Sequence, residues 1–350
     1  GTVQGTKLFR DFNHKWGGMP RNFMENNELL YFSAMAPQGG HQLYISNGSF
    51  EGTKMVKKIG KENYSSFAEE SEMISMNNEV YFSATDQIHG FELWKSDGTE
   101  NGTQLVKDIF EGLNGSMYND EYLQTFSVVE DQLFFLANDG VHGEELWVTD
   151  GSREQTRLVK DIYPGVYGSF PSNTVKLNNS IYFRAKDQSG TAIWKTDGTP
   201  EGTEKIKALN GIQAMKVVNN RLIIIAETSG TTYGPHDLWS SYGTAEGTIH
   251  IKSFGDGIDT SIQFMTIFKD ELYFIAKSPD TYYKSVYKTD GTIDGTKLVY
   301  DGADAGEHID IDLIKACGEF VYFITEKLSG YGDIELWRTE GTKESNLQIT

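Results

Sequence analysis

Arginine, histidine and tyrosine residues outside the regular parts of this sequence have the side chains best suited to carry out a reaction. Arg184 or Arg21 could neutralise the carboxylate of an acidic sugar. His142 could then remove a proton, and Tyr167 could protonate the leaving oxygen. A charge neutraliser, a base and an acid are the groups that a polysaccharide lyase requires. These four residues are therefore the candidates for a catalytic site.

The same irregular segments are rich in aromatic and histidine side chains, which suit ligand binding. Flat rings beside polar groups match sugars, which are apolar on one face and lined with hydroxyl groups at the edge. The candidate ligand-binding residues are His14, Trp16, Arg21, His89, Tyr118, His142, Tyr163, Tyr167, Arg184, Tyr233, His236 and Tyr283. The alternative is that large loops use these rings to build small cores of their own.

Four histidines return at fixed places, which favours a structural role for them. His89 and His142 each precede a glycine and lie four residues before a recurring leucine, whereas His41 and His236 lie two residues before it. Such recurrence predicts a hydrogen bond that shapes a loop. No spacing of histidines or carboxylates indicates a zinc site. Calcium is the alternative, held by loop carbonyl groups and acids, with Asp108, Asp161, Asp256 and Asp259 as candidate ligands. No other cofactor is predicted.

Arg184 stands where six related segments place a small or apolar residue, such as Ser33, Ser83 or Ile225. A buried charge is costly unless it is paired. The sequence therefore predicts that Arg184 has a carboxylate partner or faces a central channel. The alternative is an anchor for a carboxylate or sulfate group of a ligand.

The composition argues against several classes of function. Lys and Arg total 31 against 50 Asp and Glu, a formal net charge of −19. Such a surface repels phosphate backbones, so nucleic acid is not an expected partner. The single cysteine, Cys317, excludes an internal disulfide and a cysteine metal cluster. No apolar run approaches the roughly 20 residues that span a bilayer. No Gly-x-Ser-x-Gly, phosphate-loop or His-Glu-x-x-His motif is present.

A phrase that returns seven times organises the elements that must position these residues. Its fullest forms are Glu92-Leu-Trp-Lys-Ser-Asp-Gly-Thr99 and Glu145-Leu-Trp-Val-Thr-Asp-Gly-Ser152, and weaker copies begin at Leu43, Ile193, Leu238, Val286 and Leu336. The steps between the matching hydrophobic residues are 50, 53, 47, 45, 48 and 50 residues. A period of that length indicates one supersecondary unit copied in series.

Residues 71–109 show what one unit contains. Four short runs rich in aromatic and β-branched residues predict four strands, at 72–76, 80–84, 91–95 and 104–109. Asn77-Asn78 predicts a tight hairpin between the first two strands, because asparagine tolerates the positive φ of such turns. Asp97-Gly98 predicts a turn after the third strand. We therefore interpret the recurring aspartate as a turn residue and not as a catalytic one.

The fold class that follows is all-β: a seven-bladed β-propeller with four-stranded antiparallel blades. It forms a single domain over residues 1–350. The repeat units span approximately 1–48, 49–98, 99–151, 152–198, 199–243, 244–291 and 292–341, with a trailing strand at 342–350. The tryptophans of the phrase are expected to wedge between neighbouring blades. Residues 1–11 match the fourth strand of a unit, so we predict that pairing of a terminal strand closes the ring, and we favour the N-terminal strand over the trailing one.

The phrase resembles the bacterial ELWxxDGT repeat family over essentially the whole chain. The first, fifth and sixth units depart from it, at Leu43-Tyr44, Ser241-Tyr242 and Val286-Tyr287. The resemblance implies the repeat fold and an extracellular or cell-surface location, with the periplasm as the alternative, and it implies no shared catalytic residues. The chain begins at Gly1 without a signal peptide, so we expect a mature or trimmed fragment whose targeting information is missing.

Function is expected on one face of the ring, where the links between blades and the loops after the second strands vary. The leading hypothesis is a binding or scaffold module that recognises a glycan or an extracellular protein through this face. The first alternative is the polysaccharide lyase with an Arg, His and Tyr site. The second is a structural spacer in a larger surface protein. The sequence does not give the oligomeric state.

Overall fold

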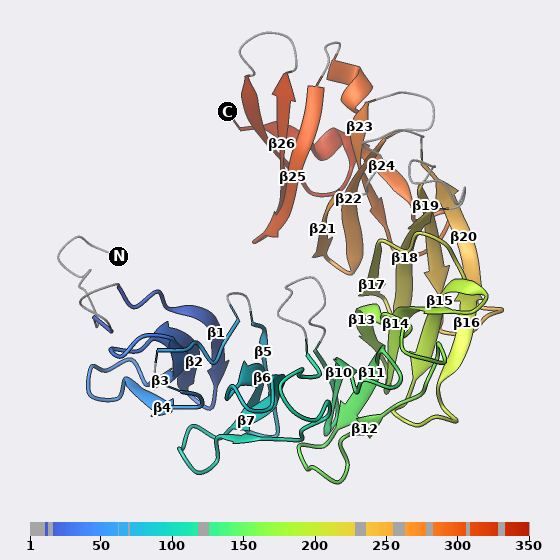
Figure 1. Ribbon diagram of the computed structural model, residues 1–350. Coiled ribbons are helices and arrows are strands. Elements are labelled where there is room, and N and C mark those ends of the chain that lie inside the picture. Colours follow the sequence, from blue (N-terminus) through green and yellow to red (C-terminus); the bar gives the residue numbers. More distant parts are fainter. Residues whose placement is uncertain are drawn as a thin grey trace. The chain divides into compact units, whose positions relative to one another are not determined.

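The computed structural model describes residues 11–12, 17–61, 63–68, 71–117, 126–227, 236–254, 263–277, 283–305, 309–327 and 333–349. Within these ranges the chain forms seven sheets of four strands, and each strand lies beside the next one along the sequence (Figure 1). The helical segments in the described part are two 3-10 turns, η1 (Gly302–Ala305) and η2 (Lys343–Ser345). Neither is long or apolar enough to cross a membrane. The prediction of an all-β chain with seven four-stranded antiparallel sheets is confirmed.

The chain divides into two compact units. The first holds residues 1–174, 185–188 and 196–203, and the second holds residues 175–184, 189–195 and 204–350. The division runs through the fourth sheet and not through a linker. A single domain that closes into a ring stays a prediction.

Three sheets lie wholly in the first unit. The first sheet contains β1 (Arg21–Asn26), β2 (Leu29–Met35), β3 (His41–Ser46) and β4 (Lys54–Lys57). The second contains β5 (Met73–Met76), β6 (Glu79–Thr85), β7 (Phe91–Ser96) and β8 (Gln104–Leu105). The third contains β9 (Ser127–Val129), β10 (Gln132–Asn138), β11 (Glu144–Thr149) and β12 (Arg157–Leu158).

The fourth sheet contributes residues to both units and contains β13 (Ser172–Leu177), β14 (Ser180–Asp187), β15 (Gly190–Thr196) and β16 (Glu204–Ala208). Three sheets lie wholly in the second unit. The fifth contains β17 (Ala214–Val218), β18 (Arg221–Glu227), β19 (His236–Ser241) and β20 (Thr248–Ser253). The sixth contains β21 (Gln263–Phe268), β22 (Glu271–Lys277), β23 (Lys284–Thr289) and β24 (Lys297–Tyr300). The seventh contains β25 (Ile309–Cys317), β26 (Phe320–Lys327), β27 (Ile334–Thr339) and β28 (Leu347–Gln348).

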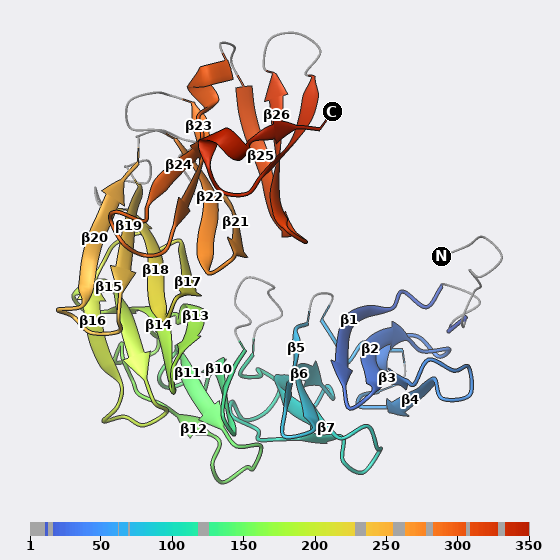
Figure 2. The same ribbon diagram turned by 180° about the vertical axis from the view of Figure 1, so that it is seen from behind.

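The hydrophobic core of the first unit consists of layers between consecutive sheets, which lie side by side in both ribbon views (Figure 2). One layer joins Tyr31, Leu43, Ile45 and Val56 of the first sheet to Met73, Val80, Phe82 and Trp94 of the second. The next joins Tyr81, Leu93 and Val106 of the second sheet to Leu133, Phe135 and Trp147 of the third. Every residue of β11 is buried because both faces of its sheet are covered. Trp94 and Trp147 are each 6% exposed, which confirms that they wedge between neighbours.

Three similar layers lie within the second unit, between the fourth and fifth sheets, between the fifth and sixth, and between the sixth and seventh. At the start of the chain, Phe12 packs on the opposite face of the first sheet from the second sheet. Its ring meets Phe32 and Tyr44 edge-on, with centroids 5.5 and 5.2 Å apart. A residue that precedes the first strand therefore covers part of the face of the first sheet that does not meet the second sheet.

The Asp-Gly turns close on themselves, as the sequence predicted. Asp97 Oδ1 accepts hydrogen bonds from the backbone N–H and the hydroxyl of Thr99, at 2.8 and 2.7 Å. The hydroxyls of Ser96 and Thr103 bond across the base of the turn at 2.7 Å. The same arrangement returns at Asp150 and Ser152. The Asn-Asn hairpin also forms, with φ of 51° and 66° at Asn77 and Asn78. The recurring aspartate is thus a turn residue.

The glycine of each turn faces the preceding sheet at very short range. Gly98 has a φ of +86°, and a Cβ there would lie 2.8 Å from the hydroxyl oxygen of Tyr31. Gly151 has a φ of +94°, and its Cβ would lie 2.2 Å from the hydroxyl oxygen of Tyr81. The turn therefore requires glycine twice, for its backbone conformation and for the approach of the neighbouring sheet. This contact explains why Asp-Gly recurs in the phrase.

Lysines after the fourth strands also join consecutive sheets. The ammonium group of Lys57 donates to the carbonyl oxygen of Thr103 in the next sheet, at 2.6 Å. Lys107 bonds in the same way to Thr156, at 2.6 Å, and its ammonium lies 5.8 Å from the centroid of the Trp147 ring. These bonds hold each turn against the sheet before it.

The last sheet differs from the prediction for the terminal strands. Trp337 and Arg338 of β27 pair with Gln348 and Leu347 of β28, so the trailing strand takes the fourth place in its own sheet. We had favoured the N-terminal strand for this place. Residues 1–10 lie outside the described residues. The hydroxyls of Thr339 and Ser345 lie 3.0 Å apart and close the turn that leads into the trailing strand.

Substitution of a turn glycine tests the contact between sheets. A left-handed backbone costs a residue with a Cβ about 1 to 2 kcal/mol. We expect Gly151→Ala to lower the free energy of unfolding by more than this amount, because Tyr81 must also move. Gly165 is the matched control, since its φ is +108° and no atom lies within 4 Å of the Cβ position. Gly165→Ala should cost only the conformational amount. Equal losses for both variants in chemical denaturation would contradict a role for the close approach.

Candidate functional site

The loops between the second and third strands of the second and third sheets share the pattern Asp-x-x-His-Gly. Asp86 Oδ1 accepts the backbone N–H of His89 at 2.9 Å, and its Oδ2 lies 2.8 Å from Nδ1 of the same histidine. Asp139 and His142 repeat both contacts at 2.8 and 2.7 Å. The prediction that these histidines shape their loops is confirmed. Because the aspartate contacts Nδ1 of each histidine, the Nε2 atom is the ring nitrogen that this contact does not use.

The links that follow these two sheets also share a pattern, Asp-Ile-aromatic-x-Gly-aliphatic-x-Gly-Ser, over residues 108–116 and 161–169. Each link packs backbone on backbone against the loop of its own sheet. A Cβ on Gly90 would lie 2.3 Å from the backbone nitrogen of Gly115, and one on Gly143 would lie 2.2 Å from that of Gly168. We call each such loop and link together a composite loop.

A buried glutamate of the repeated phrase ties the composite loop to its sheet. Glu92, fully buried in β7, accepts the backbone N–H groups of Phe110 and Ser116 at 3.1 and 2.9 Å, and also the Ser116 hydroxyl. Glu145 in β11 accepts the backbone N–H of Tyr163 at 3.0 Å and the Ser169 hydroxyl, while the backbone N–H of Ser169 donates to the carbonyl oxygen of Glu144. Burial raises the pKa of both carboxyls to about 7, although the hydrogen bonds from the link act in the opposite direction.

Sequence reasoning did not recognise this glutamate, although a signal was present. The phrase carries Glu in the second and third sheets, whose following links end in Gly-Ser and donate to it, and also in the seventh sheet, as Glu335. In the first sheet Gln42 takes the same place, and its Oε1 accepts the backbone N–H of Ile59 at 3.0 Å while its Nε2 donates to the carbonyl of Tyr64 at 3.2 Å. The amide of Gln42 therefore binds the link of the first sheet, as the carboxyl groups of Glu92 and Glu145 bind the links of the next two sheets.

The raised pKa values give the fold a dependence on pH with a definite sign. Each glutamate has a folded pKa of about 7 against the ordinary 4.5, so its protonated form is the one that folding favours. This stability is fully present below pH 4.5 and is lost as the pH rises through 7, by roughly 3 kcal/mol for each carboxyl. The double variant Glu92→Gln with Glu145→Gln should therefore unfold with a free energy that changes less between pH 5 and 8 than that of the unmodified protein. Glu100→Gln, at an exposed turn, is the control. An unchanged pH profile in the double variant would contradict this account.

The composite loops carry exposed apolar side chains at their tips. Ile88 and Leu113 are 57% and 75% exposed on the second sheet. Val141, Val166 and Tyr167 are 63%, 64% and 74% exposed on the third sheet. We call these five residues the loop tips. Ile88, Val141 and Tyr167 stand directly before His89, His142 and Gly168, and Leu113 and Val166 lie two residues before Gly115 and Gly168. Each tip is therefore within two residues of a backbone that is fixed by the contacts above.

The structure brings some of the predicted site residues together. The backbone of Tyr167 lies against Gly143, which follows His142. Arg21 Nη2 lies 3.4 Å from His41 Nε2 in the first sheet. Tyr163 carries the ammonium group of Lys186 at 5.7 Å from its ring centroid.

Other predicted residues lie elsewhere. His236 is 5% exposed, and its ring nitrogen contacts the side chain of Gln213, so it is not on the exposed loop face. Tyr283 is half-buried, and Arg184 lies half-buried in β14, in the second unit, whereas His142 and Tyr167 belong to the first. The predicted residues outside the described ranges are His14, Trp16, Tyr118, Tyr233, Asp256 and Asp259.

The remaining calcium candidates, Asp108 and Asp161, begin the two links. The Oδ1 atom of each aspartate is buried and has no hydrogen-bond partner. Among the described residues, no group of three or more acids, histidines or cysteines gathers to hold a metal ion. Calcium binding stays a prediction.

The contact between Asp139 and His142 is open to a direct test. Its hydrogen bond is the main cause that raises the pKa of His142. Burial acts in the opposite direction, and the charges of Asp139, Asp161 and Glu145 add to the increase. Asp139→Asn should therefore lower the His142 pKa, measured by NMR titration of the ring protons. Asp86→Asn removes the same contact in the neighbouring sheet and should leave His142 unchanged. A His142 pKa that stays raised in Asp139→Asn would refute the assignment.

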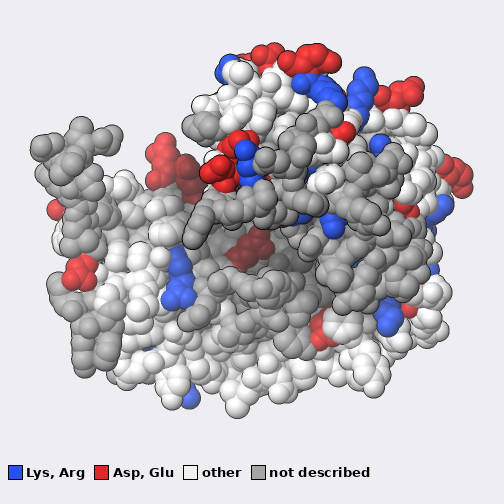
Figure 3. All heavy atoms as spheres, turned by 90° about the horizontal axis from the view of Figure 1, so that it is seen from above, with Lys and Arg blue, Asp and Glu red and all other residues white. Residues whose placement is uncertain are grey.

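Charge is mixed over the described surface. On the face shown in Figure 3, lysine and arginine side chains of the described residues stand singly or beside acidic ones, and they form no basic stripe. The formal net charge of the chain is −19. Two grooves described in the first unit lie on the side of the Asp-Gly turns. One has a volume of about 440 Å³, and the other, of about 510 Å³, is lined by Glu25, Glu28, Leu29, Leu30 and residues 46–48.

No protein-family model and no curated protein matches the chain. Solved structures do resemble it. The β-propeller domain of the Trilobed protease from Pyrococcus furiosus, which has an open velcro topology, is 14% identical with a TM-score of 0.42, and the match covers 95% of each chain. Oligopeptidase B from Leishmania major is 10% identical with a TM-score of 0.48, over 95% of this chain and 48% of that one. A puromycin-hydrolysing peptidase from Mycobacterium tuberculosis is 9% identical with a TM-score of 0.45, over 95% of this chain and 53% of that one. The chain spans about half the length of these two peptidases. The resemblance to the ELWxxDGT repeat family stays a prediction.

Proposed function

We propose that this protein is a secreted or cell-surface binding module of the β-propeller type that recognises a macromolecule through its composite loops. The observation that carries the proposal is the set of loop tips, five exposed apolar side chains on loops whose backbones are fixed by glycine contacts and buried glutamates. Exposed apolar groups that gather on rigid loops are typical of binding surfaces.

Rigidity supports binding because ordering a loop on association costs free energy. Each composite loop is already fixed by the His and Asp contacts, by the Gly pairs and by the Glu side chain below it. Little conformational entropy is then left to lose when a partner binds. The same fixation would be unnecessary for loops that only connect strands.

The chemistry of the tips favours a protein partner over a glycan. Four of the five are aliphatic, and aliphatic side chains fill apolar pockets on proteins. A sugar face packs best on a flat ring, which here only Tyr167 among the tips supplies. The extracellular setting is supported by the resemblance of the repeated phrase, and the mixed, acidic surface gives no support to a nucleic-acid partner.

Catalysis by a polysaccharide lyase is the second candidate, because the backbones around His142 and Tyr167 are in contact. An arginine to neutralise the uronate is the third group that this chemistry requires. Appearance of the ultraviolet absorbance of unsaturated uronates on acidic polysaccharides would support the lyase. Its absence across such substrates would remove it.

Replacement of the tips of one composite loop tests the proposed binding function. The triple variant Val141→Ser, Val166→Ser and Tyr167→Ser should bind the partner at least about 10-fold more weakly, since each tenfold change in affinity corresponds to about 1.4 kcal/mol and three exposed apolar contacts are removed. Immobilised protein, probed with extracellular proteins and with a glycan panel, supplies the measurement. Ile293→Ser is the control, because Ile293 is 62% exposed in an Asp-Gly turn of the sixth sheet. A triple variant that binds as well as the unmodified protein would exclude the tips, and recovery of a glycan in place of a protein would reassign the partner.

A further inference from the structure

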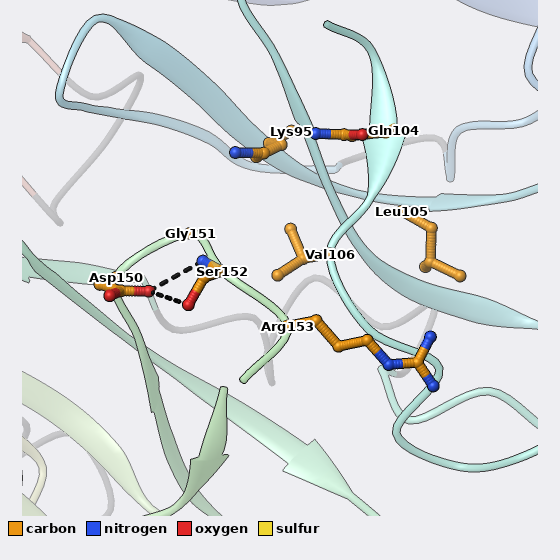
Figure 4. A pocket seen from close by; sticks show the side chains of 8 residues that line it. All are labelled: Lys95, Gln104, Leu105, Val106, Asp150, Gly151, Ser152 and Arg153. Carbon is orange, nitrogen blue, oxygen red and sulfur yellow. Dashed lines mark hydrogen bonds between the residues drawn. The ribbon is translucent and has the colours of Figure 1, made fainter. Parts of the chain in front are cut away.

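A groove of about 440 Å³ opens between the second and third sheets on the side of the Asp-Gly turns (Figure 4). Lys95 and residues 104–106 form one wall, at and after the outer strand β8 of the second sheet. The turn at 150–153 of the third sheet forms the other wall. In the view of Figure 4 the Arg153 side chain starts below Val106 and extends below Leu105, so that its guanidinium points away from Asp150. The two walls therefore combine an aliphatic surface with polar groups.

Several polar groups of this groove are not used by the protein itself. Gln104 and Arg153 are exposed, and the structure shows no hydrogen bond or ion pair from either side chain to the described residues. Asp150 uses Oδ1 for both of its bonds to Ser152, at 2.8 and 2.6 Å, which leaves Oδ2 as an acceptor. An amide, a guanidinium and a carboxylate oxygen are thus available among the residues that line this groove.

The corresponding groups in the next two sheets are occupied. Arg157 pairs with Val148 in the third sheet as Gln104 pairs with Lys95 in the second, and its guanidinium donates to the carbonyl oxygen of Gly198 at 2.7 Å. In the fourth sheet Glu204 pairs with Lys195, and their charged groups lie 3.7 Å apart. The protein bonds to itself at these positions, whereas the groove between the second and third sheets keeps its polar groups free for a ligand.

We propose that this groove binds one hexuronate unit of an acidic glycan. A guanidinium forms two parallel hydrogen bonds to a carboxylate, so Arg153 fits the charged group of such a sugar. Asp150 Oδ2 and the Gln104 amide suit hydroxyl groups at the edge of the ring. Leu105 and Val106 offer aliphatic surface to its C–H face, and the volume lies in the range of about 300 to 1,000 Å³ that small-molecule sites occupy.

Lys95 contributes positive charge without losing its own partner. Its ammonium lies 3.0 Å from Glu79, which also accepts the hydroxyl of Tyr81 at 2.9 Å. At the corresponding positions one repeat earlier, Ile45 stands in place of Lys95, Glu100 in place of Arg153 and Lys54 in place of Gln104. These positions lack the cations Lys95 and Arg153 and carry Lys54 instead, so they serve as an internal comparison.

Isothermal titration calorimetry with a hexuronate disaccharide, and with a neutral disaccharide of the same ring number, tests the proposal. We expect the hexuronate to bind and the neutral sugar to bind at least about tenfold more weakly, since one charge-assisted contact of about 1.4 kcal/mol corresponds to that ratio. Arg153→Glu should abolish hexuronate binding. This turn position accepts Glu without loss of fold, because the second sheet has Glu100 there. Lys54→Glu is the matched control. It makes the same change in net charge at the exposed residue of the first sheet that corresponds to Gln104.

The backbone amide signals of Gly151 and Ser152 should shift on titration, which places the sugar in the groove. Equal binding of both disaccharides, no binding of the hexuronate, or undiminished binding by Arg153→Glu would each overturn the proposal. The site is independent of the loop tips, so the triple variant at Val141, Val166 and Tyr167 should keep hexuronate binding. Loss of partner capture with hexuronate binding retained would then concern the loop tips alone.

Discussion

A glycine held against the second strand of the neighbouring sheet is the contact on which the rest of this structure depends. It appears between Gly98 and Tyr31, between Gly151 and Tyr81 and, within the second unit, between Gly341 and Tyr273. At each place the glycine has a positive φ, and a Cβ would collide with the tyrosine hydroxyl; an aspartate closes the turn before Gly98 and Gly151, whereas Glu340 precedes Gly341. Once these conditions are met, the tryptophan three residues before the aspartate enters the core between the sheets, as Trp94 and Trp147 do. The repeated phrase is therefore a set of requirements for contact between sheets, and a blade cannot meet them alone.

The two ends of each sheet are consequently subject to different structural constraints. At the turn end, a larger side chain would push consecutive sheets apart, so the sequence is uniform. At the loop end, a buried glutamate or glutamine below the loop fixes the backbone and leaves the tips unconstrained. Glu92, Glu145 and Gln42 fill this place in three sheets. Residues such as Val141 and Tyr167 can then change without loss of the scaffold that carries them.

Sequence reasoning predicted the fold well because its signals are local. A strand of five residues, an Asn-Asn hairpin and an Asp-Gly turn each depend on neighbours in the chain, and all of them are present. The roles of His89 and His142 followed from recurrence alone. The site was harder to predict because it depends on pairs distant in sequence, such as Glu92 with Ser116 or Gly143 with Gly168. The trailing strand at 342–350 was predicted, but the N-terminal strand was favoured over it for the fourth place of the last sheet. The structure gives this place to β28, which follows a turn closed by the hydroxyls of Thr339 and Ser345. The aliphatic tips were passed over because aromatic side chains drew attention first.

Phe12 has a consequence for the first sheet. Its ring packs edge-on against Phe32 and Tyr44, on the opposite face of that sheet from the layer shared with the second sheet. Replacement of Phe12 by a small polar residue would remove two aromatic contacts, each of which contributes about 0.5 to 1.5 kcal/mol beyond the buried area. An engineered boundary that separates Phe12 from the first strand would therefore weaken the sheet that it leaves intact.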